Sequence, residues 1–290
     1  MQPVVIDFTA LIRPQSLLGK IAGLRPVPFS TRFLTQATGV AAGWVGEGLP
    51  IPAAKGDFDA TTSLAPTKVQ SLSAHTRELA RWSGPSIEMV LAQDASRAAA
   101  LAADAAFIDL DNPGSAAKPA SITRTATQIV STGSAVTNID ADLRSALAVL
   151  NGSEIDLTFA CWAMSPRTAT YLATARGTGG SPAYPGMTAK GGLLMGLPAH
   201  TSPALLDSNS PGEANIALLA ADQVQVADDG DVSVELSDQT SLQLVDNPSS
   251  SEAQVVSLWA HGLVGLKCTR SLNWRLRRTA AVAVITGVQF

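Results

Sequence analysis

Residues 85–108 read PSIEMVLAQDASRAAALAADAAFI, and this stretch decides the fold more than any other. It contains no glycine, and its only proline stands at the first position. Proline is tolerated there because the first turn of a helix leaves its backbone N–H groups without intrahelical partners. Ser83-Gly84 before the proline and Glu88 in the first turn are further start signals. We therefore predict a long helix over residues 85–108.

One face of this helix is predicted to be apolar. Its members at helical spacing are Ile87, Val90, Leu91, Ala98, Leu101, Ala102 and Ala105. Asp94 falls within this stripe, and Arg97 follows nearly one turn later. Two explanations remain open for these charges: a buried ion pair at a subunit contact, or a simple offset of the stripe toward the surface.

The remainder of the chain predicts shorter elements. A second helix is expected over 139–150, capped by Asn138, and Ser165-Pro166 starts a third helix after a buried strand at 157–163. Residues 177–192 are expected to form a glycine-rich loop. Further strands are predicted at 216–219, 223–227, 231–237, 254–269 and 273–286, with turns at 228–230 and 246–248. Helices mixed with largely antiparallel strands indicate the α+β class.

The N-terminal part of the chain has a different character. Four prolines within the first thirty residues favour an extended segment that lies along either the body of its own chain or a neighbouring chain. Residues 34–66 are rich in Gly, Pro and Ala and have only weak periodicity. Because a long structureless segment is unusual inside a domain, we expect an extended hairpin that reaches away from the body.

The composition indicates a chain that is buried against other chains. Only 15% of the 290 residues are charged, whereas a soluble chain carries about 25%. A compact monomer of this mass would expose roughly 11,700 Å² of surface, and the charged residues would be sparse on a surface of that size. Disorder and a coiled coil are excluded, and the net charge of −4 disfavours a nucleic-acid binder that relies on bulk positive charge.

The sequence carries no pattern typical of an active site. His75, His200 and His261 lie far apart, so no metal site is predicted. Neither a nucleophile elbow nor a phosphate-binding loop occurs, and we expect no catalytic residue and no cofactor. Cys161 and Cys268 are too few for a disulfide scaffold or a four-cysteine zinc site. No apolar run approaches the length of a membrane span, and the first ten residues lack a signal peptide's pattern.

One basic run, Arg275-Leu276-Arg277-Arg278, remains to be explained. Strand alternation places Arg275 and Arg277 on one face, so the run is not a continuous basic surface. It could face packaged nucleic acid, but we favour salt bridges to a neighbouring subunit.

Six landmarks follow one another along the chain. They are Trp44-Val45-Gly46-Glu47-Gly48, a strand at Lys68-Val69, the turn Asp111-Asn112-Pro113-Gly114, the run Trp162-Ala163-Met164-Ser165-Pro166, the turn at 191–198 and the strands at 266–286. In this order they resemble the major capsid proteins of tailed phages with the HK97-type fold. The first is similar to the family's W-x-x-E-G motif before an extended loop, and the fourth to its W-V-M-N-P signature.

The resemblance implies a domain layout. An N-terminal arm would cover 1–27, and an extended β-hairpin loop 46–74. A discontinuous peripheral domain with the long spine helix would combine 28–45, 75–125 and 228–270. An axial domain would combine 126–227 and 271–290.

The resemblance also implies a structural function. Many copies, arranged as pentamers and hexamers, would close into an icosahedral phage head around double-stranded DNA. The chain would be located in the virion after assembly in the host cytoplasm, with no membrane partner. Portal and scaffold proteins are expected partners, and a decoration protein is a possible one; DNA would be contacted non-specifically. The candidate inter-subunit contact residues are Trp44, Glu47, Lys55, Phe58, Asp94, Arg97, Asp246 and Asn247.

Two departures from the family pattern bear on these expectations. The chain starts directly at the arm, so we expect either a mature product or a separate scaffold protein. Some members weld subunits by a Lys–Asn isopeptide bond, and Lys55 stands where that lysine would be. Residues 257–263 contain no Asn or Glu, so covalent crosslinking is not expected.

Two other functions remain open. An encapsulin-type nanocompartment would share the fold but enclose enzymes. The other alternative is an α+β enzyme with an unrecognised site.

Overall fold

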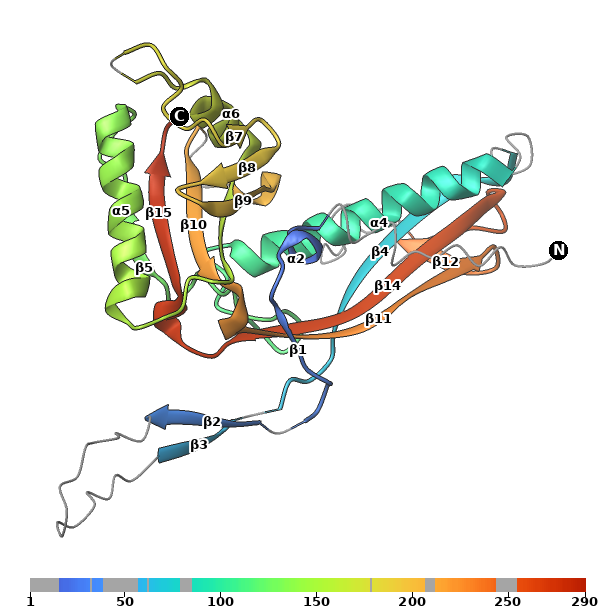
Figure 1. Cartoon of the computed structure of the whole chain (residues 1–290). Helices are drawn as coiled ribbons and strands as arrows, with labels where there is room; N and C mark the ends of the chain where they lie inside the picture. The colour runs from blue at the N-terminus through green and yellow to red at the C-terminus, as the bar shows by residue number, and fades with distance from the viewer. Residues whose placement is uncertain are drawn as a thin grey trace, which may run out of the picture.

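The computed structural model describes residues 16–31, 33–38, 57–61, 63–78, 85–177, 179–206, 212–243 and 255–290. Over these ranges the strands form a seven-stranded sheet, a four-stranded sheet and two separate two-stranded pairs. Figure 1 shows a compact body around the larger sheet and a long projection of helix and sheet that leaves it. The mixed α+β fold predicted from the sequence is confirmed.

The seven-stranded sheet is buried on both faces. Its strands, in spatial order, are β5 (Thr127–Val130), β15 (Val282–Val288), β10 (Ala214–Ala220), β6 (Ala160–Met164), β9 (Leu197–Thr201), β8 (Gly191–Leu194) and β7 (Met187–Thr188). Trp162 and Met164 of β6 pack on the same side as α5 (Val136–Gly152) and α6 (Pro166–Thr174). Cys161 and Ala163 pack on the other side with the end of α4 (Pro85–Ile108). Burial of alternate residues on opposite faces explains why these strands are apolar throughout.

Among the described residues, the four-stranded sheet is covered on one face only. Its order is β1 (Arg25–Pro26), β11 (Val224–Ser237), β14 (Leu263–Leu276) and β4 (Thr67–Thr76). Leu266 and Cys268 of β14 are buried with Ala95 and Ala100 of α4, which lies along this face (Figure 1). On the opposite face Lys267 is only partly buried, and Leu72 of β4 is 55% exposed.

Two chain segments run from one sheet into the other. β10 continues into β11 through η2 (Ala221–Gln223), and β14 continues into β15 through η3 (Thr279–Ala281). The backbone N–H of Arg277 donates to the carbonyl of Gln223 at 2.9 Å, so a hydrogen bond joins these two connections between the sheets. A two-stranded ladder therefore links the body to the projection.

Several predicted boundaries are wrong because a turn signal was taken for the end of a strand. Residues 228–230 are not a turn between two strands: β11 continues through them, with an irregularity between Asp228 and Val232. Gly230 has a φ of +72°, and its N–H donates to the Asp228 carboxylate. These residues, which are typical of a turn, therefore form a bulge within the strand. The C-terminal strands break at η3, further along the chain than expected.

The predicted helices are present, but one predicted cap is wrong. The long helix and the Ser165-Pro166 start are confirmed, with the Ser165 hydroxyl accepting from the N–H of Thr168. The second helix begins at Val136, so Asn138 is not its cap; its side chain instead donates to the carbonyl of Thr132.

The glycine-rich stretch is also more ordered than predicted, because it contains β7 and β8. A Cβ at Gly191 would lie 2.2 Å from the carbonyl oxygen of Ala199, so glycine is required where these strands approach.

The buried face of α4 is not the predicted stripe. Ala98, Ala102 and Ala105 are exposed, and the buried positions include Ala95, Ala99, Ala100, Ala103 and Phe107. Alanine occurs on every side of this helix, so hydropathy alone does not distinguish its faces. Contacts with the two sheets decide which face is buried.

Candidate assembly surfaces

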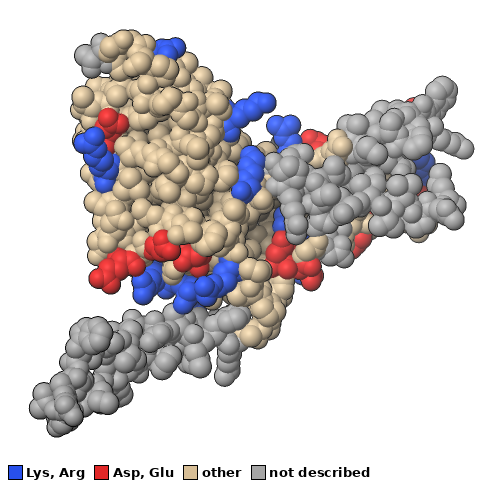
Figure 2. Space-filling view, viewed as in Figure 1, with Lys and Arg blue, Asp and Glu red and all other residues tan. Residues whose placement is uncertain are grey.

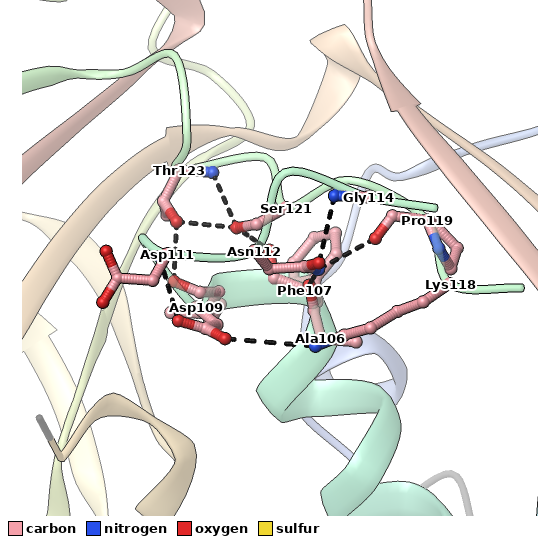
Figure 3. A network of polar contacts seen from close by, with 11 residues as sticks. Ala106, Phe107, Asp109, Asp111, Asn112, Gly114, Lys118, Pro119, Ser121 and Thr123 are labelled. Carbon is pink, nitrogen blue, oxygen red and sulfur yellow. Dashed lines mark hydrogen bonds and ion pairs between the residues drawn. The ribbon is translucent and has the colours of Figure 1, made fainter. Parts of the chain in front are cut away.

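The end of α4 is held by a turn that satisfies its last carbonyl groups (Figure 3). The side-chain amide of Asn112 donates to the carbonyls of Ala106 and Pro119, both at 2.8 Å. The hydroxyl of Ser121 donates to the carbonyl of Phe107 at 2.9 Å, and that of Thr123 to Ile108 at 2.6 Å. The last carbonyls of a helix have no intrahelical donors, so these side chains replace the missing ones.

This turn also fixes the direction in which the chain leaves the helix. Gly114 has a φ of +82°, and its N–H donates to Oδ1 of Asn112 at 3.1 Å. The ring of Trp274 on β14 packs edge-on against Phe107 with centroids 5.3 Å apart, and its Nε1 donates to the carbonyl of Ala120. The turn therefore joins the long helix to the four-stranded sheet.

A buried carboxylate anchors the N-terminal segment to the helix. Asp104 of α4 accepts from the Ser16 hydroxyl and the Leu17 N–H, both at 2.8 Å, at the start of α2 (Leu17–Lys20). It also accepts from Ser202 at 3.3 Å, beside η1 (Pro203–Leu205). Burial raises the pKa of Asp104, and the hydrogen bonds from Leu17, Ser16 and Ser202 oppose that rise. Three segments far apart in sequence meet at this one side chain.

A hairpin separate from both large sheets leaves the body. β2 (Phe33–Thr38) and β3 (Asp57–Thr61) pair antiparallel and form a sheet of their own. Figure 1 shows this ribbon pointing away from the rest of the chain. An isolated two-stranded hairpin is at best marginally stable in water, so its geometry favours a role in contacts with another molecule.

The far end of the projection exposes large apolar side chains. Trp259 is 70% exposed, Val255 of β13 (Val255–Ser257) is 69% exposed, and Leu236 of β11 is 62% exposed. β13 pairs with β12 (Ser241–Gln243) close to these residues. The chain exposes 16704 Å² in all, compared with roughly 11,700 Å² for a compact monomer of this mass.

The predicted contact residues are dispersed over these surfaces. In the single chain, Asp94 and Arg97 are both exposed on α4, as expected if the apolar stripe is offset toward the surface. Phe58 lies on β3 of the hairpin. Trp44, Glu47, Lys55, Asp246 and Asn247 lie outside the described residues. Their roles in contacts between subunits stay predictions.

The histidines and cysteines do not gather into a site. His75 contacts the Ser73 hydroxyl at 3.1 Å, and burial followed by the charge of Lys20 lowers the pKa of His200. Cys161 and Cys268 are buried, and burial raises the pKa of Cys161 to about 12. No cluster of three metal-ligating side chains occurs among the residues that the structure describes. Within the same residues, no helix is both long and apolar enough to cross a bilayer.

Comparison with known proteins identifies the family. The model of the phage capsid family matches residues 7–287. The chain belongs to the phage capsid family. It is 35% identical over 299 residues to a capsid polyprotein of Pseudomonas phage PAJU2. That match covers 99% of this chain but only 44% of the polyprotein, so the chain spans less than half the length of this relative.

Solved structures confirm the capsid fold. A chain from Mycobacterium phage Ogopogo superposes with a TM-score of 0.68 at 20% identity. The match covers 94% of the chain described here and 92% of the Ogopogo chain. The capsid of a native GTA particle superposes with a TM-score of 0.63 at 18% identity, covering 99% and 93%. The resemblance to the HK97-type capsid fold is therefore confirmed.

Sequence reasoning missed two features of these surfaces. Asp104 was not singled out, because a lone aspartate in an alanine-rich helix looks like a solvated residue. Trp259 was not singled out either, although a tryptophan beside the Ala260-His261-Gly262 turn signal could have been noticed as a candidate for exposure.

Proposed function

We propose that this chain is the major shell subunit of a phage head, assembling in many copies as pentamers and hexamers into an icosahedral shell around double-stranded DNA. The shell would form in the host cytoplasm and become part of the virion. Its role would be structural and not catalytic. A portal, a scaffold and in some particles a decoration protein would be its partners.

The hairpin is the observation that supports this proposal most directly. It is paired only with itself among the described strands, and it leaves a body whose own core is complete. The half-covered four-stranded sheet and the exposed apolar tip add two further surfaces suited to contacts between copies. The polyprotein relative and the GTA particle are capsid proteins by name, which favours the same role here.

Negative-stain microscopy of the purified chain, with and without a scaffold candidate, tests the proposal. We expect closed particles tens of nanometres across. In particles recovered from host cells, nuclease-protected DNA absorbance separates a phage head from an encapsulin-type compartment. A chain that remains a monomer or dimer even with its scaffold would contradict the proposed function.

A deletion tests the role of the hairpin. Removing residues 50–61 and joining the ends by a short Gly/Ser linker spares Leu64, which is buried and whose carbonyl accepts from the N–H of Ser30. We expect a folded subunit with an unchanged melting temperature that no longer forms closed shells. Normal particles from this variant would show that the hairpin is not needed for assembly.

A further inference from the structure

Arginines from two strands and a following turn gather at the junction of the two sheets. Arg25 on β1 lies opposite Gln225 on β11, and Gln225 lies opposite Arg275 on β14, so these residues form one row across three strands. Arg277 and Arg278 follow directly after β14. We refer to Arg25, Arg275, Arg277 and Arg278 as the arginine cluster. Figure 2 shows basic side chains along the lower margin of the body, where Figure 1 places the end of β14.

The members of the cluster repel one another. The pKa of Arg277 is lowered, first by burial and then by the charges of Arg25 and Arg278. Asp222 is the carboxylate that opposes this shift. Its Oδ2 accepts from the side chain of Gln223, and its Oδ1 is buried without a hydrogen-bond partner among the described residues. The charge of Asp222 therefore offsets part of this repulsion at Arg277.

Four basic side chains outside the cluster, Arg77, Lys118, Lys267 and Arg270, are paired with carboxylates among the described residues. Arg270 binds Asp228 through two nitrogens, at 2.5 and 3.3 Å, and Lys267 binds Glu235 at 3.3 Å. Arg77 binds Asp238 at 2.6 Å. By contrast, among the residues that the structure describes, no carboxylate lies within 4.0 Å of any arginine of the cluster. Arg25, Arg275 and Arg278 are exposed and available to a partner.

The hairpin supplies the complementary charge. Residues 33–66 contain the acidic residues Glu47, Asp57 and Asp59 and the single basic residue Lys55, so their net charge is −2. Asp57 and Asp59 both belong to β3. The ribbon has no further sheet partner among the described strands of its own chain.

We propose that the arginine cluster is the receptor for the aspartate-bearing strand β3 from a second copy of this chain, an inference that rests on the proposed function. Charge complementarity selects the partner and its register, and the conversion of several unpaired guanidinium groups into ion pairs relieves their mutual repulsion. Nucleic acid is the other polyanion that such a cluster could bind. The chain's net charge of −4 and the presence of acidic residues on its own unpartnered ribbon favour the second copy.

A charge exchange tests the pairing. The double variant R275E/R278E is expected to lower the yield of closed particles about tenfold or more, without changing the melting temperature of the subunit. Adding D57R/D59R to the same chain restores the opposite charges across the contact and is expected to return most of the yield. The control R124E/R144E changes the net charge by the same amount at exposed arginines outside the cluster.

The outcomes separate this inference from the proposed function. Particle yields like those of the parent for R275E/R278E, or no recovery on adding D57R/D59R, would overturn the pairing while leaving the capsid function intact. Normal particles that hold less DNA would overturn it in favour of nucleic acid.

A second measurement does not require closed shells. R278C and D57C chains are mixed at high concentration and treated with a short bismaleimide. A crosslinked dimer that weakens at high salt is expected, because exposed charge pairs are screened. A dimer no more abundant than that from an R124C and D57C mixture would overturn the pairing, even if the parent forms no particles.

Discussion

The two large sheets are connected by two chain segments but bury their strands to different extents. In the seven-stranded sheet every residue of β6 and nearly every residue of β10 is buried, because helices cover both faces. In the four-stranded sheet the positions of β14 are partly buried more often than buried. Among the described residues, the cluster between α4 and this sheet has four buried members, Ala95, Ala100, Leu266 and Cys268. The body is therefore stable on its own core, whereas the projection leaves a face for other molecules.

The contrast lies in where each region keeps its apolar area. Each Å² of apolar area that is buried within the body stabilises the folded chain by about 25 cal/mol. The same kind of area at the tip, around Trp259, is left exposed in the isolated chain. Low charge in the whole sequence thus reflects apolar surface in two places, one already buried and the other exposed.

Two tryptophans provide the strongest test of this difference. Trp162 is fully buried and its Nε1 donates to the carbonyl of Leu194, so W162A is expected to lower the free energy of unfolding by about 3–5 kcal/mol. Trp259 is 70% exposed, so W259A is expected to change it by less than about 0.5 kcal/mol. Urea unfolding of unassembled subunits measures both. A loss at Trp259 as large as that at Trp162 would show that the tip is held by its own chain.

The turn between the two regions is expected to give an intermediate effect. N112A removes two donors at 2.8 Å from the carbonyls of Ala106 and Pro119, and the acceptor for Gly114. Buried groups left without partners should cost about 2 kcal/mol in unfolding free energy. D109A is the control in the same turn, since its side chain is 43% exposed, accepts from the nearby N–H of Asp111 and lies 4.0 Å from the ammonium group of Lys118. Equal effects of the two variants would contradict the role of Asn112 as a helix cap.

The smallest expected effect is a pH dependence at Asp104. Because burial raises its pKa above the ordinary value of 3.8, the folded chain takes up this proton before the unfolded chain does. The contribution of Asp104 to the free energy of unfolding therefore increases as pH falls from above the raised value toward 3.8.

D104N is the matched variant for this effect, because its amide can keep hydrogen bonds to Ser16, Leu17 and Ser202 without titrating. Unfolding in urea at several pH values between neutral and weakly acidic is expected to show the parent gaining stability relative to D104N as pH falls. A constant difference between the two chains would contradict a raised pKa. D104A, which loses all of these bonds, is expected to be less stable than both.

Local chemistry allowed some elements to be predicted with their bounds. The helix over 85–108 has a proline start and no internal breaker, and the Ser165-Pro166 cap needs only its own neighbours. The face of α4 could not be predicted, because alanine at Ala95 and at Ala98 has the same hydropathy although the first is buried and the second exposed. The bulge at Asp228 looked like a turn, because the same residues serve both structures.

The α+β class, the position of the long helix, the family and the expected burial against other chains could all be predicted from the sequence alone. These depend on propensity, composition and short motifs, which are local properties of the chain. Tertiary contacts are needed to show that Asp104 joins three distant segments, that Trp162 is buried while Trp259 is exposed, and that Arg25 stands in register with Arg275. Each of these depends on how segments far apart in the sequence pack together, and no local pattern carries that information.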